Sequence, residues 1–333
     1  MSTSPQLTAG AARLGFSASA GGRVTLLELC SSNRDELAKT VLRPFPDGVG
    51  PARLLHWPKG GIYPLIPYSN RVKDSTLDFH GRRYGLPSHP DAYPHTLHGH
   101  AHRMIWEMTS LTKSHVTMRY VHAGGTEWPW PFSATLDIDL EPTRARFSLC
   151  LRNDGQTPMP GGIGLHPYFQ HDPNDRVAFD APIDWPVTPD YCANLPRDRA
   201  SPAEAGPLPP GEVTLYRSGW RGLCVIDRTN GDRIEMQADP AFSHFVLHRP
   251  ANAEYLCAEP VSHVADGFNL FAKGYPCTGT VVLKPKEALK GSVTISLGLA
   301  GVPSLGSDRT RGRWRPEGAD RLEGSGRLLR ARF

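Results

Sequence analysis

Alternation of apolar and polar residues with a period of two is the feature that most restricts how this chain can fold. In residues 132–142 the apolar side chains occupy every second position, and residues 145–153 repeat the pattern. A period of two places the apolar side chains on one face of a β-strand. Pro142 lies in the short connection between the two segments and is typical of a turn. Together the two segments predict a β-hairpin.

The same alternation recurs along the chain, in residues 115–123, 244–250 and 292–300. Helical spacing is rare, and only residues 34–42 predict a turn or two of helix. The 333 residues include 33 Gly and 32 Pro, so turn-forming residues are abundant. Many short strands separated by such residues indicate an all-β fold, a large β-sandwich of antiparallel sheets.

The net charge of +4 is concentrated at one end of the chain. Residues 304–333 hold eight Arg against four Asp or Glu, so residues 1–303 are close to neutral. A neutral body argues against nucleic acid as a partner. We expect residues 1–303 to form one β-sandwich domain and the Arg- and Gly-rich residues 304–333 to form a disordered tail.

The six cysteines are spread over the chain and include no C-x-x-C pair, which predicts free thiols in a reducing compartment. Residues 1–22 contain no apolar core of a signal peptide. No stretch approaches the roughly 18 consecutive apolar residues of a membrane-spanning helix. We therefore expect a cytoplasmic protein without a membrane partner.

Residues 94–103 contain four histidines, His95, His98, His100 and His102. On an extended strand the last three would share one face, where neutral imidazoles can bind a metal. A single histidine in this segment could instead transfer protons at neutral pH. The pattern alone leaves both interpretations open.

Two titratable residues lie in apolar surroundings. His166 lies within GLHPYF, and Glu259 follows an apolar stretch. Either residue alone is commonly structural, as a core histidine or a solvated glutamate. Together they meet the needs of proton transfer at two points, because partial burial raises the pKa of a carboxylate and tunes that of an imidazole. Pro167 and Pro260 follow them and favour extended backbone.

Several motifs, in this order and spacing, resemble the aldose 1-epimerase (mutarotase) family over roughly residues 8–300. They are PYSNRV (67–72), HGRRYGL (80–86), LHGH (97–100), WPWPF (128–132), GLHPYF (164–169) and AEPVSHVADGFN (258–269). The resemblance implies the family's large antiparallel β-sandwich, the galactose mutarotase-like supersandwich. It also implies an isomerase that interconverts the α and β anomers of a reducing sugar by opening and closing the ring, with no cofactor and no metal.

By this resemblance Glu259 matches the general base and His166 the general acid, and the two exchange tasks when the ring closes. His98 matches a histidine that binds the sugar near the reacting oxygens. Arg71 matches the residue that orients sugar hydroxyls, with Asn70 beside it. The implied partner is a small-molecule sugar, and the chain would act as a monomer or homodimer. His95, His100 and His102 receive no task.

One segment departs from the family pattern. Where the family usually has an acidic residue that binds sugar hydroxyls, residues 213–220 read VTLYRSGW, with no Asp. Arg217 lies there instead, which motivates the hypothesis that the substrate is an acidic or phosphorylated sugar. Trp128, Trp130 and Tyr168 offer apolar faces to a sugar, although packing in the core explains them equally well.

Two alternatives remain at this point. A catalytically idle sugar-binding or sugar-sensing protein would use the same scaffold, but it has no need to keep both His166 and Glu259. A cupin-type metal enzyme would use His100, His102 and Glu107, which have the spacing of the first cupin motif. The glycines expected around that motif are absent, so the match is poor.

Overall fold

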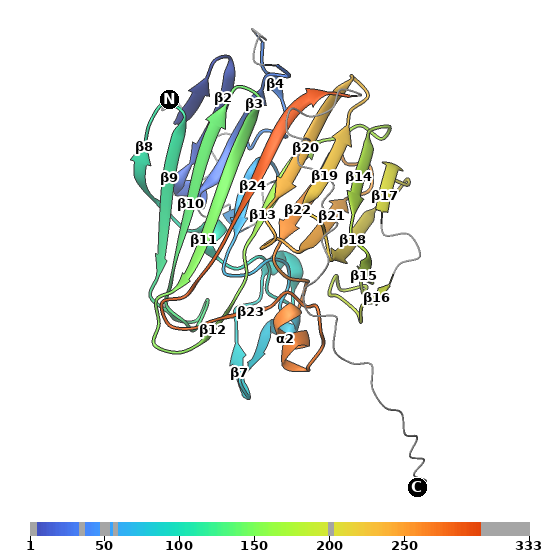
Figure 1. Ribbon diagram of the computed structural model, residues 1–333. Helices are drawn as coiled ribbons and strands as arrows, with labels where there is room; N and C mark the ends of the chain where they lie inside the picture. Colours follow the sequence, from blue (N-terminus) through green and yellow to red (C-terminus); the bar gives the residue numbers. More distant parts are fainter. Residues whose placement is uncertain (1–4, 33–36, 47–53, 56–58, 199–202, 301–333) are drawn as a thin grey trace, which may run out of the picture. The chain divides into compact units, whose positions relative to one another are not determined.

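The computed structural model describes residues 5–32, 37–46, 54–55, 59–198 and 203–300 (Figure 1). Residues 1–300 form one compact unit. The tail predicted at residues 304–333 lies outside the described residues, so its disorder stays a prediction.

Two large antiparallel sheets make up most of the described chain. The eleven-stranded sheet has the order β1-β2-β3-β5-β13-β22-β21-β18-β15-β16, and β4 pairs with β3. Its strands are β1 (Gln6–Ala9), β2 (Ala12–Ser17), β3 (Arg23–Leu29), β4 (Lys39–Thr40), β5 (Ile62–Leu65), β13 (Gly164–Gln170), β15 (Ile183–Trp185), β16 (Arg197–Asp198), β18 (Val213–Ser218), β21 (His244–Arg249) and β22 (Tyr255–Val261).

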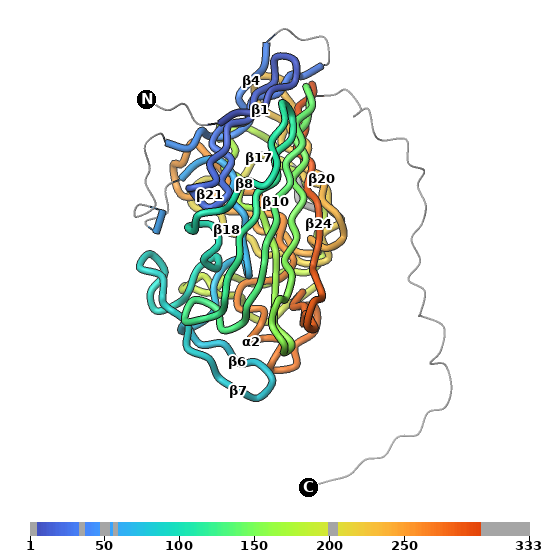
Figure 2. The backbone as a smooth tube through the Cα atoms, turned by 90° about the vertical axis from the view of Figure 1, so that its left-hand side faces the viewer, coloured from blue at the N-terminus to red at the C-terminus, as the bar shows by residue number. Residues whose placement is uncertain are grey.

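The nine-stranded sheet has the order β17-β14-β19-β20-β24-β11-β10-β9-β8 and faces the viewer in Figure 1. Its strands are β8 (Glu107–Leu111), β9 (His115–His122), β10 (Phe132–Glu141), β11 (Arg144–Asn153), β14 (Arg176–Asp180), β17 (Ala203–Pro207), β19 (Leu223–Asp227), β20 (Asp232–Ala238) and β24 (Ala288–Leu299). The turned view of Figure 2 separates the layers, with β20 and β24 on one side and β18 and β21 on the other. The fold is therefore the predicted antiparallel β-sandwich.

Short elements complete the described chain. Two small hairpins pair β6 (Thr76–Phe79) with β7 (Arg82–Gly85) and β12 (Met159–Gly161) with β23 (Val281–Leu283). The helices are α2 (Gly267–Ala272) and the 3-10 turns η1 (Ala18–Ala20), η2 (Lys73–Ser75), η3 (Pro90–Ala92) and η4 (Ala101–Arg103). None of the helices in the described ranges is long and apolar enough to cross a membrane.

The predicted hairpin is confirmed, because β10 pairs with β11 from Phe132↔Asn153 to Glu141↔Arg144. Its alternating apolar side chains, such as Leu136, Ile138 and Phe147, are buried in the core between the two sheets. The segments at 115–123, 244–250 and 292–300 also form strands, namely β9, β21 and the end of β24. The period of two thus identified these strands correctly.

The predicted helix at residues 34–42 is wrong where the structure describes it. Residues 39–40 form β4, and Val41 donates its backbone N–H to Leu27 O at 2.9 Å. Pairing with β3 satisfies the backbone, and the buried Val41 and Leu42 join the core. Tertiary pairing has overridden a weak local preference for helix. Residues 34–36 lie outside the described residues.

The two faces of the eleven-stranded sheet bury different residues. Leu165, Leu247 and Ala258 belong to the core between the sheets. Their neighbours along the strands alternate to the opposite face, where Val246 and Cys257 belong to a second buried cluster rich in tyrosine. The site described next lies on this second face.

Candidate active site

Strand register brings His166 and Glu259 together, although 92 residues separate them in the chain. β13 and β22 are neighbours, with Gly164 opposite Val261 and Tyr168 opposite Cys257. The same register sets position 166 opposite position 259. Because cross-strand partners point to the same face, both side chains leave the sheet on the same side.

The row that contains this pair continues across neighbouring strands. Tyr63 of β5 is opposite His166, and Val246 of β21 is opposite both Glu259 and Tyr216 of β18. A second row beside it joins Cys257, His248 and Thr214. Five adjacent strands, joined by backbone hydrogen bonds, therefore form the floor of the site.

A cavity of about 280 Å³ lies over this floor. All five predicted site residues line it: Asn70, Arg71, His98, His166 and Glu259. Their side chains come from two strands of the sheet and from the segments that follow β5 and η3. The structure thus brings the predicted residues into one cavity; their roles in binding and catalysis stay predictions.

His166 and Glu259 contact each other directly. Nε2 of His166 lies 3.3 Å from Oε1 of Glu259, and the side chains are 2% and 4% exposed. Burial raises the pKa of Glu259, with Arg71 and Lys59 opposing the change, and burial holds the pKa of His166 well below its usual range. Burial therefore favours the uncharged form of both side chains. The pair holds one transferable proton, which rests on Glu259.

Aromatic rings fix the plane of the His166 imidazole. Tyr63 and Tyr168 both stack on it, each with its ring centroid 4.7 Å away. The guanidinium carbon of the buried Arg23 lies 4.3 Å from the centre of the Tyr63 ring. This stack leaves His166 little freedom to rotate.

His98 and Asn70 hold each other in place. The backbone N–H of Asn70 donates to Nδ1 of His98 at 3.0 Å, and the His98 N–H donates to Asn70 O at 2.8 Å. Burial holds the pKa of His98 well below its usual range, so the ring is neutral and its proton lies on Nε2. Gly99 follows with a φ of +65°, and a Cβ there would lie 2.3 Å from Ile66 O. The LHGH motif therefore needs its glycine.

Arg71 is held by Asn70 and by an aromatic ring. Its Nη1 donates to Asn70 Oδ1 at 3.3 Å, and its guanidinium carbon lies 4.9 Å from the centre of the Tyr191 ring. Nε of Arg71 and Oε2 of Glu259 are buried and have no hydrogen-bond partner among the described residues. A buried donor and acceptor in one cavity suit a polar ligand, because each needs a partner.

The AEPVSHVADGFN motif also supports the loop that carries Arg71. The Ser69 N–H donates to Nε2 of His263 at 3.3 Å, and the Asp266 N–H donates to Arg71 O at 2.8 Å. Asp266 Oδ1 in turn accepts from the N–H of Lys73 at 2.9 Å. Most of the motif after Glu259 is therefore structural.

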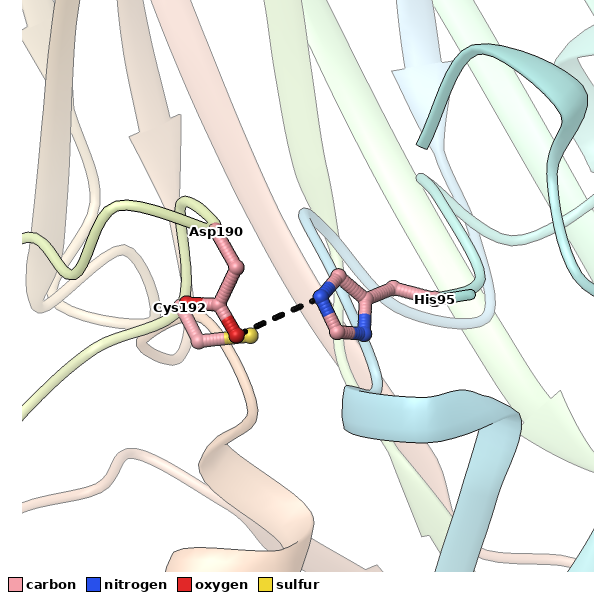
Figure 3. Close-up of side chains that lie close together, drawn as sticks. All are labelled: His95, Asp190 and Cys192. Carbon is pink, nitrogen blue, oxygen red and sulfur yellow. Dashed lines mark ion pairs between the residues drawn. The ribbon is translucent and has the colours of Figure 1, made fainter. Parts of the chain in front are cut away.

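Two groups of three side chains have the types and spacing of metal ligands. One joins Cys257 to His166 and Glu259. The other is His95, Asp190 and Cys192, shown in Figure 3. Positive charge opposes a cation at both: Lys59 acts electrostatically on Glu259, and Lys73 Nζ lies 3.5 Å from Asp190 Oδ2. Neither group needs a metal to explain its contacts.

The cupin arrangement is not formed. His100 contacts Tyr120 Oη at 3.1 Å and His122 Nδ1 at 3.2 Å, away from the cavity. Glu107 is exposed on β8 of the other sheet. His100, His102 and Glu107 therefore do not form a ligand group within the described ranges.

Arg217 does not line the cavity. It forms a buried ion pair with Asp184 and lies between Tyr216 and Ser218 on β18. Since Thr214 and Tyr216 of this strand line the cavity, Arg217 must point to the opposite face. The hypothesis that Arg217 binds an acidic sugar is therefore wrong. Trp128 and Trp130 belong to the main hydrophobic cluster and do not line the cavity; Trp130 packs on Phe79 and Tyr84 of the β6–β7 hairpin.

Five further polar or aromatic residues line the cavity and were missed by the sequence analysis: Tyr191, Glu212, Thr214, Tyr216 and His248. Two of them, Thr214 and Tyr216, alternate on β18 within the segment already singled out as unusual. Tyr191 and Glu212 lie in irregular segments, where no periodic signal predicts orientation.

A larger cavity, about 860 Å³, lies elsewhere and contains none of the five predicted residues. Two of its charged groups already have backbone partners. Arg228 donates to Thr40 O and Val41 O, and Asp175 accepts the backbone N–H of Thr229. We therefore assign the chemistry to the smaller cavity, in spite of its size.

Comparisons with known proteins identify relatives of this chain. The family model for aldose 1-epimerase matches residues 25–296. The uncharacterized protein YphB of Escherichia coli K12 is 28% identical over 219 residues, which cover 61% of this chain and 73% of YphB.

Solved structures share the fold. A putative aldose 1-epimerase from Escherichia coli K12 has a TM-score of 0.75 and 22% identity, covering 89% of this chain and 99% of that one. The GalM/aldose epimerase homologue from C. elegans has a TM-score of 0.71 and 14% identity, with the same coverage. Because the family model spans most of its length, the chain belongs to the aldose 1-epimerase family.

Proposed function

We propose that this protein is an aldose 1-epimerase, an isomerase that interconverts the α and β anomers of a reducing sugar without a cofactor. The contact of 3.3 Å between His166 Nε2 and Glu259 Oε1 carries the proposal, because the cavity around it is also lined by Arg71 and His98. Membership of the family supports the same reaction.

In the proposed reaction the proton of the pair first passes from Glu259 to His166 across their 3.3 Å contact. The Glu259 carboxylate then takes the proton of the C1 hydroxyl while His166 gives its proton to the ring oxygen. The bond between C1 and the ring oxygen then breaks and leaves an open-chain aldehyde. After rotation about the C1–C2 bond, the ring oxygen attacks the other face of C1; Glu259 gives its proton back to the C1 oxygen, and His166 takes its proton back from the attacking hydroxyl. The pair holds one proton before and after ring opening, so each turnover balances.

The surroundings of the pair favour this exchange. Ring opening leaves a protonated Glu259 and a neutral His166, and these are the forms that burial stabilises. His98 presents its Nε2 proton, and Arg71 its Nε proton, as donors to sugar oxygens. Such fixed donors hold the substrate in one pose, which lowers the entropic part of the barrier.

The test is the polarimetric decay of freshly dissolved α-glucose and α-galactose with the wild type and with Glu259→Gln. Loss of general base catalysis should lower the rate about 10²- to 10⁴-fold. The matched control is Glu107→Gln, the same change at an exposed position on β8, which should keep the wild-type rate. Sugar binding by the wild type without any turnover would instead favour the idle sugar-binding protein.

We also propose a cytoplasmic location. The six cysteines form no disulfide in the structure, as expected for a chain kept in a reducing compartment. Fractionation of cells that express the protein, with the thiols labelled by an alkylating reagent, tests this location; recovery of the protein outside the cytoplasm would contradict it.

A further inference from the structure

One wall of the cavity has no part in the proposed acid and base chemistry. It consists of Tyr191, Glu212, Thr214 and His248, which we call the Glu212 wall. Tyr191 lies in the segment between β15 and β16, and Glu212 lies directly before β18. Thr214 and His248 are cross-strand partners on β18 and β21.

The four side chains of the Glu212 wall form one hydrogen-bonded chain. Tyr191 Oη donates to Glu212 Oε1 at 2.6 Å, and Thr214 Oγ1 donates to the same oxygen at 3.3 Å. His248 Nδ1 lies 2.9 Å from Thr214 Oγ1. This leaves the second carboxylate oxygen of Glu212 and the second ring nitrogen of His248 as polar atoms for a ligand.

The wall lies at a distance that suits a sugar. β22, which carries Glu259, and β18, which carries Thr214, are separated by β21 alone. Two strand spacings amount to about 10 Å. One hexopyranose with a hydrogen bond at each end bridges such a gap, so a sugar whose C1 lies at His166 and Glu259 presents its distal hydroxyls to the Glu212 wall.

The segment that carries Tyr191 is contacted at that residue and at the residue before it. Tyr216 Oη donates to Tyr191 O at 2.8 Å. His95 Nε2 lies 3.4 Å from Asp190 Oδ2, the pair joined by the dashed line in Figure 3. Nδ1 of His95 accepts the Asp74 N–H at 2.9 Å, so Nε2 is the ring nitrogen that faces Asp190. His95, which had no task in the sequence analysis, is thus a positioning residue for Tyr191.

The charge of the wall restricts the substrate. A carboxylate accepts hydrogen bonds from hydroxyl groups, but it repels a second carboxylate or a phosphate. Arg71, the cation that lines the cavity, is held against Tyr191 and Asn70.

On the basis of the proposed function, we propose that the Glu212 wall determines specificity: it binds the hydroxyl groups opposite the anomeric carbon and selects neutral aldoses over uronic acids and sugar phosphates.

The experiment compares kcat and KM for glucose, glucuronate and glucose 6-phosphate in the wild type, Glu212→Gln and Tyr191→Phe. The wild type should prefer glucose. Loss of a hydrogen bond to a charged group in Glu212→Gln should raise KM for glucose about tenfold, with a smaller change in kcat. The preference for glucose over the two anions should shrink at the same time, because the repulsion is gone. Tyr191→Phe should raise KM without changing that preference.

Glu107→Gln is the control for removal of one negative charge, and far-ultraviolet circular dichroism checks that each variant folds. A wild type that prefers either anion, or a Glu212→Gln variant with unchanged KM and unchanged preference, would overturn the inference. If no sugar is turned over, the proposed function fails, and calorimetric titration with glucose still tests the wall: Glu212→Gln should bind about tenfold more weakly. A wild type that binds no glucose in that titration overturns the inference as well.

Discussion

Two histidine–carboxylate pairs lie near the cavity with almost the same separation. His166 and Glu259 are 3.3 Å apart, and His95 and Asp190 are 3.4 Å apart. Glu259 is buried, and its pKa is raised by that burial. Asp190 is 38% exposed, and its pKa is lowered to about 2, first by the hydrogen bond from the Thr188 hydroxyl. Separation alone therefore does not determine what such a pair does.

Solvent exposure and the neighbouring donors make the difference. In the buried pair, burial disfavours the charged form of both residues, and a carboxylate whose pKa lies close to neutral pH suits proton transfer to and from a substrate. In the other pair His95 is buried and only Asp190 is partly exposed; the Asp190 carboxylate stays ionised and contacts His95 beside the Tyr191 segment. The His166–Glu259 pair suits proton transfer, and the His95–Asp190 pair suits a structural contact.

The largest expected effect is on kcat, measured in the single and double variants of each pair. His166→Gln and Glu259→Gln should each lower kcat about 10²- to 10⁴-fold, and the double variant should lose little more, because residues that act as a unit are not additive. His95→Gln and Asp190→Asn should change kcat only a few-fold and act mainly on KM. A His95→Gln variant as inactive as His166→Gln would erase the contrast.

The second test measures the free energy of unfolding, which removal of the buried carboxylate should increase. The pKa of Glu259 is raised from 4.5 to about 8 in the folded protein, so ionisation above pH 4.5 favours the unfolded chain. Glu259→Gln should then raise the free energy of unfolding by about 1–3 kcal/mol at pH 7. The gain should grow from pH 4.5 to 8 and vanish near pH 4.5. Urea denaturation at several pH values measures it, and a loss of stability at pH 7 would contradict it.

The smallest effect concerns the His95–Asp190 pair and has the opposite sign. The pKa of Asp190 is lowered, so its contribution to stability is present above pH 3.8 and is lost as pH falls toward 2. Asp190→Asn should reduce the free energy of unfolding by less than about 1 kcal/mol at pH 7, because solvent screens the charge. The same denaturation series detects this loss; a gain like that of Glu259→Gln would show that the two pairs do not differ.

Much of the fold was predictable because the alternation in β10, β11 and β24 is nearly complete. The β4 strand was not, since only its pairing with β3 makes Lys39 and Thr40 extended. The site residues His166 and Glu259 were found through their motifs and their apolar surroundings. That they meet depends on which strands become neighbours, and a period of two carries no information about neighbours.

For the remaining residues, the sequence does not predict which side chains point into the cavity. Arg217 attracted attention as a charge in an unusual place, but β18 turns it away and presents Thr214 and Tyr216 instead. Tyr191 has a φ of +58° in an irregular segment, so its direction depends on the tertiary contacts of its neighbours. Glu212 follows Gly211 in a connection rich in proline and has no pattern that orients it.

The register of β13 and β22 holds the reacting pair, whereas Tyr191 and Glu212 belong to connections between strands. Chemistry and substrate choice thus rest on mechanically separate parts of one molecule. Insertions and exchanges in the two connections leave the hydrogen-bonded ladder under His166 and Glu259 untouched. Substrate preference can therefore change during evolution while the residues proposed to open the ring stay in place.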